Sequence, residues 1–92
     1  MDNQHKQIKG YRDLSQEEIN LMNKIKALAE QVGELVKEIQ SKTSNDYMES
    51  DPDDEYEWDS AYAAVDWASN AKKDLQLGFM QLVRAVAKPQ SF

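Results

Sequence analysis

Tyr11 and Arg12 are adjacent in segment 8–14 and could bind a nucleotide. A tyrosine ring gives a base a surface to stack on, worth about 1–3 kcal/mol per base. Lys9 and Arg12 add cations that suit a phosphate group. Alternatively, Tyr11 packs beneath the loop that leads into the first predicted helix, and Arg12 pairs with Asp13. Residue types by themselves favour this packing role slightly.

Lys26 and Asn23 form a second pair with ligand-binding chemistry. Lys26 follows the apolar Ile25 in a predicted helix, so its ammonium group could reach an anionic ligand held between subunits, and Asn23 could add an amide. More commonly, a lysine beside an apolar seam extends to water or pairs along the helix. Glu30, four residues later, is such a partner. Periodicity alone favours one of these two roles over ligand binding.

A polar strip on the second predicted helix is the third candidate. Its members recur at helical spacing and share one face: Ser69, Lys72, Lys73 and Gln76. A solvated helix face explains most of this pattern. Arg84 and Lys88 have a similar explanation, because they lie one turn apart near the predicted end of the helix, where cations suit the helix dipole.

The residue inventory argues against catalysis and against a metal or other cofactor. The chain has no cysteine, which excludes thiolate metal sites and cysteine nucleophiles. Its single histidine, His5, lies near an end that is expected to fray, which argues against a Ser-His-Asp triad and a histidine-rich metal site. The three glycines are too far apart for a phosphate-binding loop. An alternating acidic run resembles a calcium loop, but Tyr56 and Tyr62 occupy the positions that need Gly and Glu. We therefore expect a binding protein rather than an enzyme.

Negative charge is concentrated in the middle of the chain. The net charge is −6, yet stretch 44–66 holds nine acidic residues and no Lys or Arg. The remaining residues include eight acids and eleven bases, so these parts could accept a phosphate ligand. Binding to duplex DNA is not expected, because DNA would also meet the acidic field.

No segment predicts a membrane span or export. The mean hydropathy is −0.82, and no apolar run approaches the roughly 20 residues that cross a bilayer. The first seven residues lack the apolar stretch of a signal peptide. We expect a cytosolic protein with no membrane partner.

The first predicted helix covers about 16–42. Ser15 and Glu18 form a capping box at its start, each side chain accepting from the other's backbone amide. A heptad seam follows, made of Leu21, Ile25, Leu28, Val32, Leu35 and Ile39. Flanking residues widen this seam to a core-facing stripe: Met22, Ala29 and Val36. The polar residues of 41–46 are expected to end the helix.

The second predicted helix covers about 52–88. Asp51 suits the N-cap and Pro52 the first helical position, although a start nearer Ser60 also agrees with the sequence. Pro89 disfavours helical backbone before it, so the helix must stop by Lys88. The prediction is an all-α protein: an N-terminal arm (1–14) and a long antiparallel helical hairpin, in one domain over 1–92.

Large apolar side chains exceed what one hairpin seam can bury, with Trp58, Trp67, Phe79 and Met80 among them. A chain of 92 residues buries only about 60–65% of its unfolded surface. We therefore expect the hairpin to assemble as a homo-oligomer.

Two segments resemble the small bacteriophage proteins of the anti-CBASS type 2 family. They are IKGYRDLSQEEINLMNKIK (8–26) and LQLGFMQLVRAVAKP (75–89). The resemblance covers the N-terminal arm, the start of the first helix and the last part of the second. It does not extend to about 27–71, and the acidic run is peculiar to this sequence.

The resemblance implies a homohexamer that captures cyclic oligonucleotides without cleaving them, blocking CBASS effectors in the cytoplasm of an infected bacterium. It implies that Tyr11 stacks on a base and Lys26 meets a phosphate of a cyclic dinucleotide, with Arg12 and Asn23 nearby. It also suggests that the polar strip contributes to a separate cyclic trinucleotide pocket. Without the resemblance, the residues would still fit a structural or adaptor hairpin that binds a protein partner.

Overall fold

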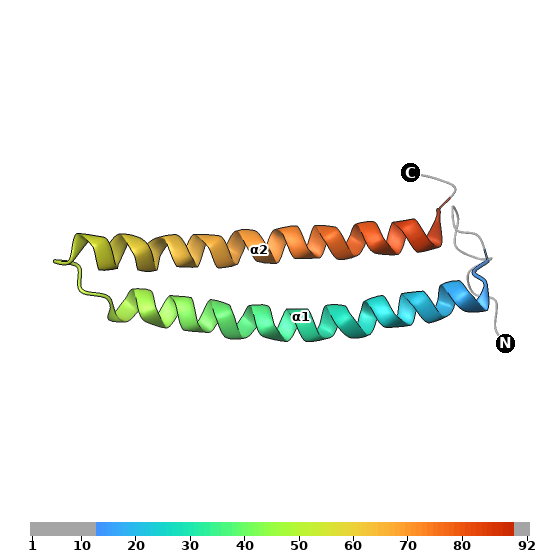
Figure 1. Cartoon of the computed structure of the whole chain (residues 1–92), viewed down its shortest axis with the longest axis horizontal. Helices are drawn as coiled ribbons and strands as arrows, with labels where there is room; N and C mark the ends of the chain where they lie inside the picture. Colours follow the sequence, from blue (N-terminus) through green and yellow to red (C-terminus); the bar gives the residue numbers. More distant parts are fainter. Residues whose placement is uncertain (1–12, 90–92) are drawn as a thin grey trace. The chain divides into compact units, whose positions relative to one another are not determined.

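A computed structural model of the chain describes residues 13–89, which form two α-helices and no β-strand (Figure 1). Helix α1 covers Gln16–Glu49 and helix α2 covers Glu55–Ala87. The two helices form a hairpin, which confirms the all-α prediction. The N-terminal arm lies almost entirely outside the described residues, and so do Tyr11 and Arg12.

The chain divides into two compact units, and each contains a stretch of both helices. Unit 1 comprises Met1–Ala29 and Leu77–Phe92, and unit 2 comprises Glu30–Gln76. In its described part, unit 1 therefore joins the start of α1 to the end of α2. Unit 2 contains the rest of both helices and the turn between them. One domain over 1–92 stays a prediction.

The start of α1 is fixed by the capping box. The Glu18 amide donates to Ser15 Oγ at 3.1 Å, and the Ser15 amide donates to Glu18 Oε1 at 2.9 Å. These reciprocal bonds satisfy amides that have no partner inside the helix. The predicted start is confirmed.

The predicted end of α1 near residue 42 is wrong, because the helix continues to Glu49. Lys42 Nζ donates to both carboxylate oxygens of Asp46 one turn later, at 2.7 and 2.6 Å. Thr43 Oγ1 donates to the Gln40 carbonyl at 3.1 Å. Thr43 and Asp46, two of the polar residues expected to end the helix, thus bond within it instead.

An aromatic cluster in unit 2 explains why the extra turns of α1 persist. The Tyr47 ring lies 5.3 Å from that of Trp58 and 5.6 Å from that of Tyr62, between ring centroids. Such pairs contribute about 0.5–1.5 kcal/mol beyond the apolar area that they bury. Packing against α2 therefore outweighs the weak local preference for a turn.

The start of α2 is shifted from the predicted Pro52 to Glu55. Asp51 forms a turn instead of the N-cap: its Oδ1 accepts from the Asp53 amide at 2.9 Å and its carbonyl accepts from the Asp54 amide at 3.0 Å. Asp54 is the N-cap, since its Oδ1 accepts from the Glu57 amide at 3.1 Å.

The end of α2 follows the prediction from Pro89. Lys88 takes a left-handed conformation with φ of 46°. Its amide donates to the Arg84 carbonyl at 2.9 Å. This is the single-bond C-cap that usually has Gly at the left-handed position.

The apolar seam of α1 differs from the predicted one. Leu28 and Leu35 are 52% and 53% exposed. The half-buried face runs instead through Met22, Ile25, Ala29, Val32 and Val36. The face that packs within the chain therefore combines the predicted flank with Ile25 and Val32 of the predicted seam, while the leucines of the seam are exposed.

Complete burial is limited to small side chains within 13–89. Ala68 and Ala87 are the buried apolar residues, and Ser50 is the buried polar one. Ser50 Oγ donates to the Tyr47 carbonyl at 2.6 Å, which satisfies the hydroxyl at the end of α1. A core without large buried side chains is small, as expected for a chain that gains stability from association.

Candidate functional site

A groove of about 560 Å³ lies within unit 1, between the start of α1 and the end of α2. We call it the unit 1 groove. Helix α1 lines it with Met22, Asn23, Ile25, Lys26 and Ala29. Helix α2 lines it with Phe79, Met80, Val83 and Arg84.

Helical spacing explains why these side chains meet. On each helix the lining residues fall three or four positions apart, so they share one face. On α1 that face is part of the half-buried seam, and Phe79 and Val83 of α2 are also half-buried. Packing between the helices therefore fixes the groove floor.

The floor of the unit 1 groove is apolar and adaptable. Met22 and Met80 contribute flexible thioether side chains, and Phe79 contributes an aromatic ring. Methionine fits irregular shapes and makes favourable contacts with rings. Such a floor can receive a flat, partly apolar group such as a nucleobase without selecting strongly for one base.

The polar members of the unit 1 groove are two cations and one amide. Lys26 and Arg84 come from different helices, and Asn23 stands beside them. Within 13–89, no carboxylate lines the groove. Among residues 13–89, the side chains of Lys26 and Arg84 make no ion pair or hydrogen bond. Of the two ordinary roles predicted for Lys26, the ion pair with Glu30 is not formed, and the exposed side chain agrees with extension to water.

The two units differ strongly in charge. The sequence of unit 1 contains seven bases and four acids, a net of +3. The sequence of unit 2 contains four bases and thirteen acids, a net of −9. An anionic ligand is therefore favoured in unit 1 and disfavoured in unit 2, more so at low salt.

The structure brings together two of the predicted binding residues, Lys26 and Asn23. Tyr11 and Arg12 lie outside the described residues. The polar strip belongs to unit 2, where Ser69 is half-buried and the other three members are exposed. None of its four residues lines the unit 1 groove.

Four lining residues were not recognised as site residues from spacing alone: Phe79, Met80, Val83 and Arg84. Their apolar members look like ordinary core, and the arginine looks like a helix-end cation. The available signal was the family-like string 75–89, which contains all four.

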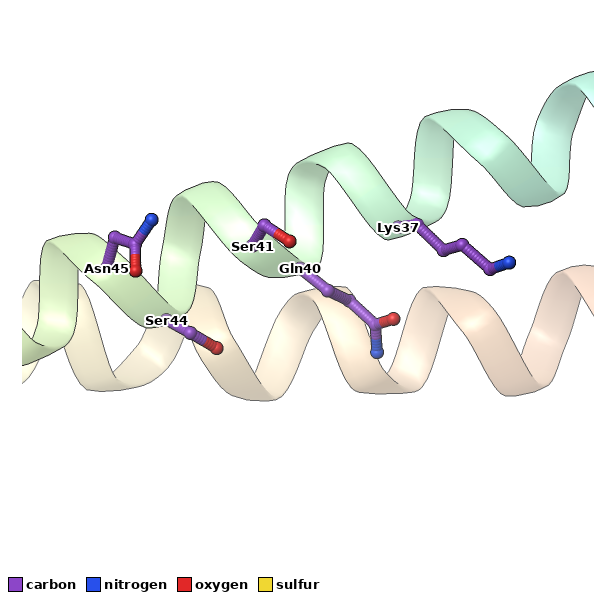
Figure 2. A pocket seen from close by; sticks show the side chains of 5 residues that line it. All are labelled: Lys37, Gln40, Ser41, Ser44 and Asn45. Carbon is purple, nitrogen blue, oxygen red and sulfur yellow. The ribbon is translucent and has the colours of Figure 1, made fainter.

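A polar groove of about 510 Å³ lies in unit 2 (Figure 2). All of its lining side chains come from α1: Lys37, Gln40, Ser41, Ser44 and Asn45. Because one helix supplies every lining residue, this groove is an open strip of a helix face. It lacks the apolar floor that the unit 1 groove offers to a base.

Metal and membrane features are not found in the part of the chain that the structure describes. No three His, Cys, Asp or Glu side chains there are grouped so that they could hold a metal ion. Neither α1 nor α2 has a stretch long and apolar enough to cross a membrane.

Comparisons with known proteins agree with the resemblance seen in the sequence. The family model described as the Acb2/Tad1 hairpin domain matches residues 3–87. Anti-CBASS protein 2 of Pseudomonas phage JBD67 is 38% identical over 106 residues, covering 98% of each chain. The similarity therefore includes both helices and the unit 1 groove.

Proposed function

Because the chain belongs to the Acb2/Tad1 hairpin-domain family, we propose that it is a phage anti-CBASS protein that binds cyclic dinucleotides and holds them without cleavage. Sequestration would keep these second messengers from CBASS effectors in the cytoplasm of the infected bacterium. The observation that carries the proposal is the unit 1 groove, in which two cations that have no ion-pair partner within 13–89 accompany an apolar floor.

The chemistry of a cyclic dinucleotide matches this groove. The two phosphates of the ligand suit the two cations of the groove, Lys26 and Arg84. The bases of the ligand suit the floor of methionine and phenylalanine side chains. A closed ring loses little conformational freedom when it binds. Sequestration needs nanomolar affinity or better, about −12 kcal/mol. Stacked bases and charge-assisted phosphate contacts supply free energy of that order.

Two further groups of residues complete the proposal. Tyr11 would stack on a base and Arg12 would approach a phosphate, with Asn23 supplying an amide from the groove wall. The polar strip would contribute to a separate site for cyclic trinucleotides. Its Lys72 and Lys73 are two of the four cations in the sequence of acidic unit 2.

Self-association is part of the proposed function, with a homohexamer as the expected assembly. Leu21, Leu28 and Leu35 are spaced seven residues apart in α1, and all three are exposed. A seven-residue leucine repeat is typical of a helix that packs against another helix. This face supports packing against further copies of the chain, which could place two grooves about a two-fold axis.

Isothermal titration with a 3′,3′-cyclic dinucleotide tests the proposal on protein of known oligomeric mass. Wild-type protein should bind tightly, and denaturation of the complex should release intact ligand. Lys26→Gln should weaken binding about tenfold to a hundredfold, as expected for a lost charge-assisted contact. Lys24→Gln removes the same charge from α1 outside the groove and should bind like the wild type.

Two results would contradict the proposal. Absence of binding at several temperatures would remove its basis, and recovery of cleaved ligand would show an enzyme instead.

The exposed leucines also suit an adaptor hairpin that binds a protein partner. That alternative predicts a helical oligomer with no nucleotide affinity, and hence no ligand-induced rise in melting temperature.

A further inference from the structure

We infer that Arg84 is a second phosphate-binding residue of the unit 1 groove, acting with Lys26 on a ligand that carries two phosphate groups. The inference rests on the proposed function. It adds to the proposed site a residue whose spacing and charge had indicated only a cation near the end of the helix. It also explains how α2 takes part in binding: α1 supplies one cation and α2 the other.

Placement separates Arg84 from the neighbouring cations. The described part of unit 1 contains Lys24, Lys26, Arg84 and Lys88 as its cationic residues. Of these four, Lys26 and Arg84 line the groove and the other two do not. Their positions on the two helices, rather than the overall basic charge of unit 1, thus place Lys26 and Arg84 in the groove lining.

The C-cap of α2 does not use the Arg84 side chain, and a favourable interaction with the helix dipole does not occupy its N–H donors. The C-cap of α2 is made by backbone atoms, with the Lys88 amide donating to the Arg84 carbonyl at 2.9 Å. Within 13–89 the guanidinium group donates to no carbonyl or carboxylate. Its five N–H donors are therefore available to an anion at the groove.

The guanidinium group of Arg84 has a geometry that suits a phosphodiester. Its planar fork can donate two parallel hydrogen bonds to two phosphate oxygens, whereas the Lys26 ammonium acts as a point charge. None of the described residues that line the groove is a carboxylate that would compete for it. One cation from each helix thus matches a ligand with two phosphates and a closed backbone.

Three variants test this role by titration with 3′,3′-cyclic di-AMP. Arg84→Gln should weaken binding about tenfold to a hundredfold, the range expected for a lost hydrogen bond to a charged group. Arg84→Lys keeps the charge without the fork and should lie between Arg84→Gln and the wild type. Lys24→Gln, with the same change in charge outside the groove, should bind like the wild type. The affinity of Arg84→Gln should also fall less steeply with salt, because one ionic contact is missing.

Each alternative result overturns the inference. Arg84→Gln with the affinity and salt dependence of Lys24→Gln would show that Arg84 does not contact the ligand. Loss of helical circular dichroism or of the wild-type mass in both Arg84 variants would assign the residue to folding or assembly. Failure of the proposed function gives a different result, because the wild type and Lys24→Gln would then bind nothing either.

Discussion

Lys26 of α1 and Arg84 of α2 line the same groove, although they lie near opposite ends of the chain. This pairing depends on the hairpin, which joins the start of one helix to the end of the other within unit 1. The cations sit beside an apolar floor and face no carboxylate of the lining. This combination distinguishes the groove from the acidic surface of unit 2.

Substitutions in the polar strip should separate the two proposed nucleotide sites. We expect Lys72→Gln/Lys73→Gln to weaken cyclic trinucleotide binding about tenfold or more while cyclic dinucleotide affinity stays unchanged. Lys26→Gln should have the reverse effect, since Lys26 belongs to unit 1. Titration of each variant with both ligands measures this. Lys37→Gln is the control for lost charge in unit 2, and equal losses for both ligands in either variant would contradict separate sites.

Asp54 should contribute to stability as the N-cap of α2. We expect Asp54→Ala to lower the free energy of unfolding by about 1 kcal/mol, because the Glu57 amide loses its acceptor. Asp53→Ala is a matched control, since it removes the same charge one residue earlier. Urea denaturation at fixed protein concentration compares the two variants. Equal destabilisation would mean that charge near the helix end, and not the cap, is responsible.

Lys88 should be a site where glycine stabilises the protein. The residue has φ of 46°, a conformation that costs a residue with a Cβ about 1 kcal/mol and glycine little. We expect Lys88→Gly to raise the unfolding free energy by up to about 1 kcal/mol, partly offset by the flexibility of glycine in the unfolded chain. Lys88→Gln keeps the Cβ and should show no such gain in thermal unfolding. A destabilised Lys88→Gly protein would argue against the left-handed cap.

The acidic run should keep polyanions away from the protein. We expect duplex DNA to bind at low salt when four exposed carboxylates of this run are neutralised together. None of these carboxylates makes a capping bond. The variant combines Asp53→Asn, Glu55→Gln, Glu57→Gln and Asp59→Asn. The effect should fade at about 0.15 M salt, where the Debye length is about 8 Å. Fluorescence anisotropy with labelled duplex DNA measures it, and cyclic dinucleotide affinity serves as the control. A wild-type protein that already binds DNA would contradict this role.

Features that depend on a few neighbouring residues were predictable from the sequence. The capping box of Ser15 and Glu18 formed as predicted, because its donors and acceptors lie within one helical turn. Pro89 ended α2 at the expected place, since its ring restricts the residue before it. Lys26 and Asn23 were singled out from their types and their positions in the predicted helix, and both line the unit 1 groove, while their role in binding stays a prediction.

Other features were decided by tertiary structure. The contacts of Tyr47 with Trp58 and Tyr62 accompany the continuation of α1 through residues that favour turns. Periodicity predicted one broad apolar stripe on α1, and packing against α2 covers only the part of it that contains Met22, Ile25 and Ala29 and leaves the leucines exposed.

The sequence by itself determined the all-α class, the capping box at Ser15 and Glu18, the end of α2 and the family, because these follow from local hydrogen bonding, from Pro89 and from matched strings. Only the tertiary structure decided where α1 ends and placed Arg84 in the lining of the unit 1 groove. A helical repeat shows which residues share a face but not which face of a partner helix meets it. That choice depends on packing between residues far apart in the chain.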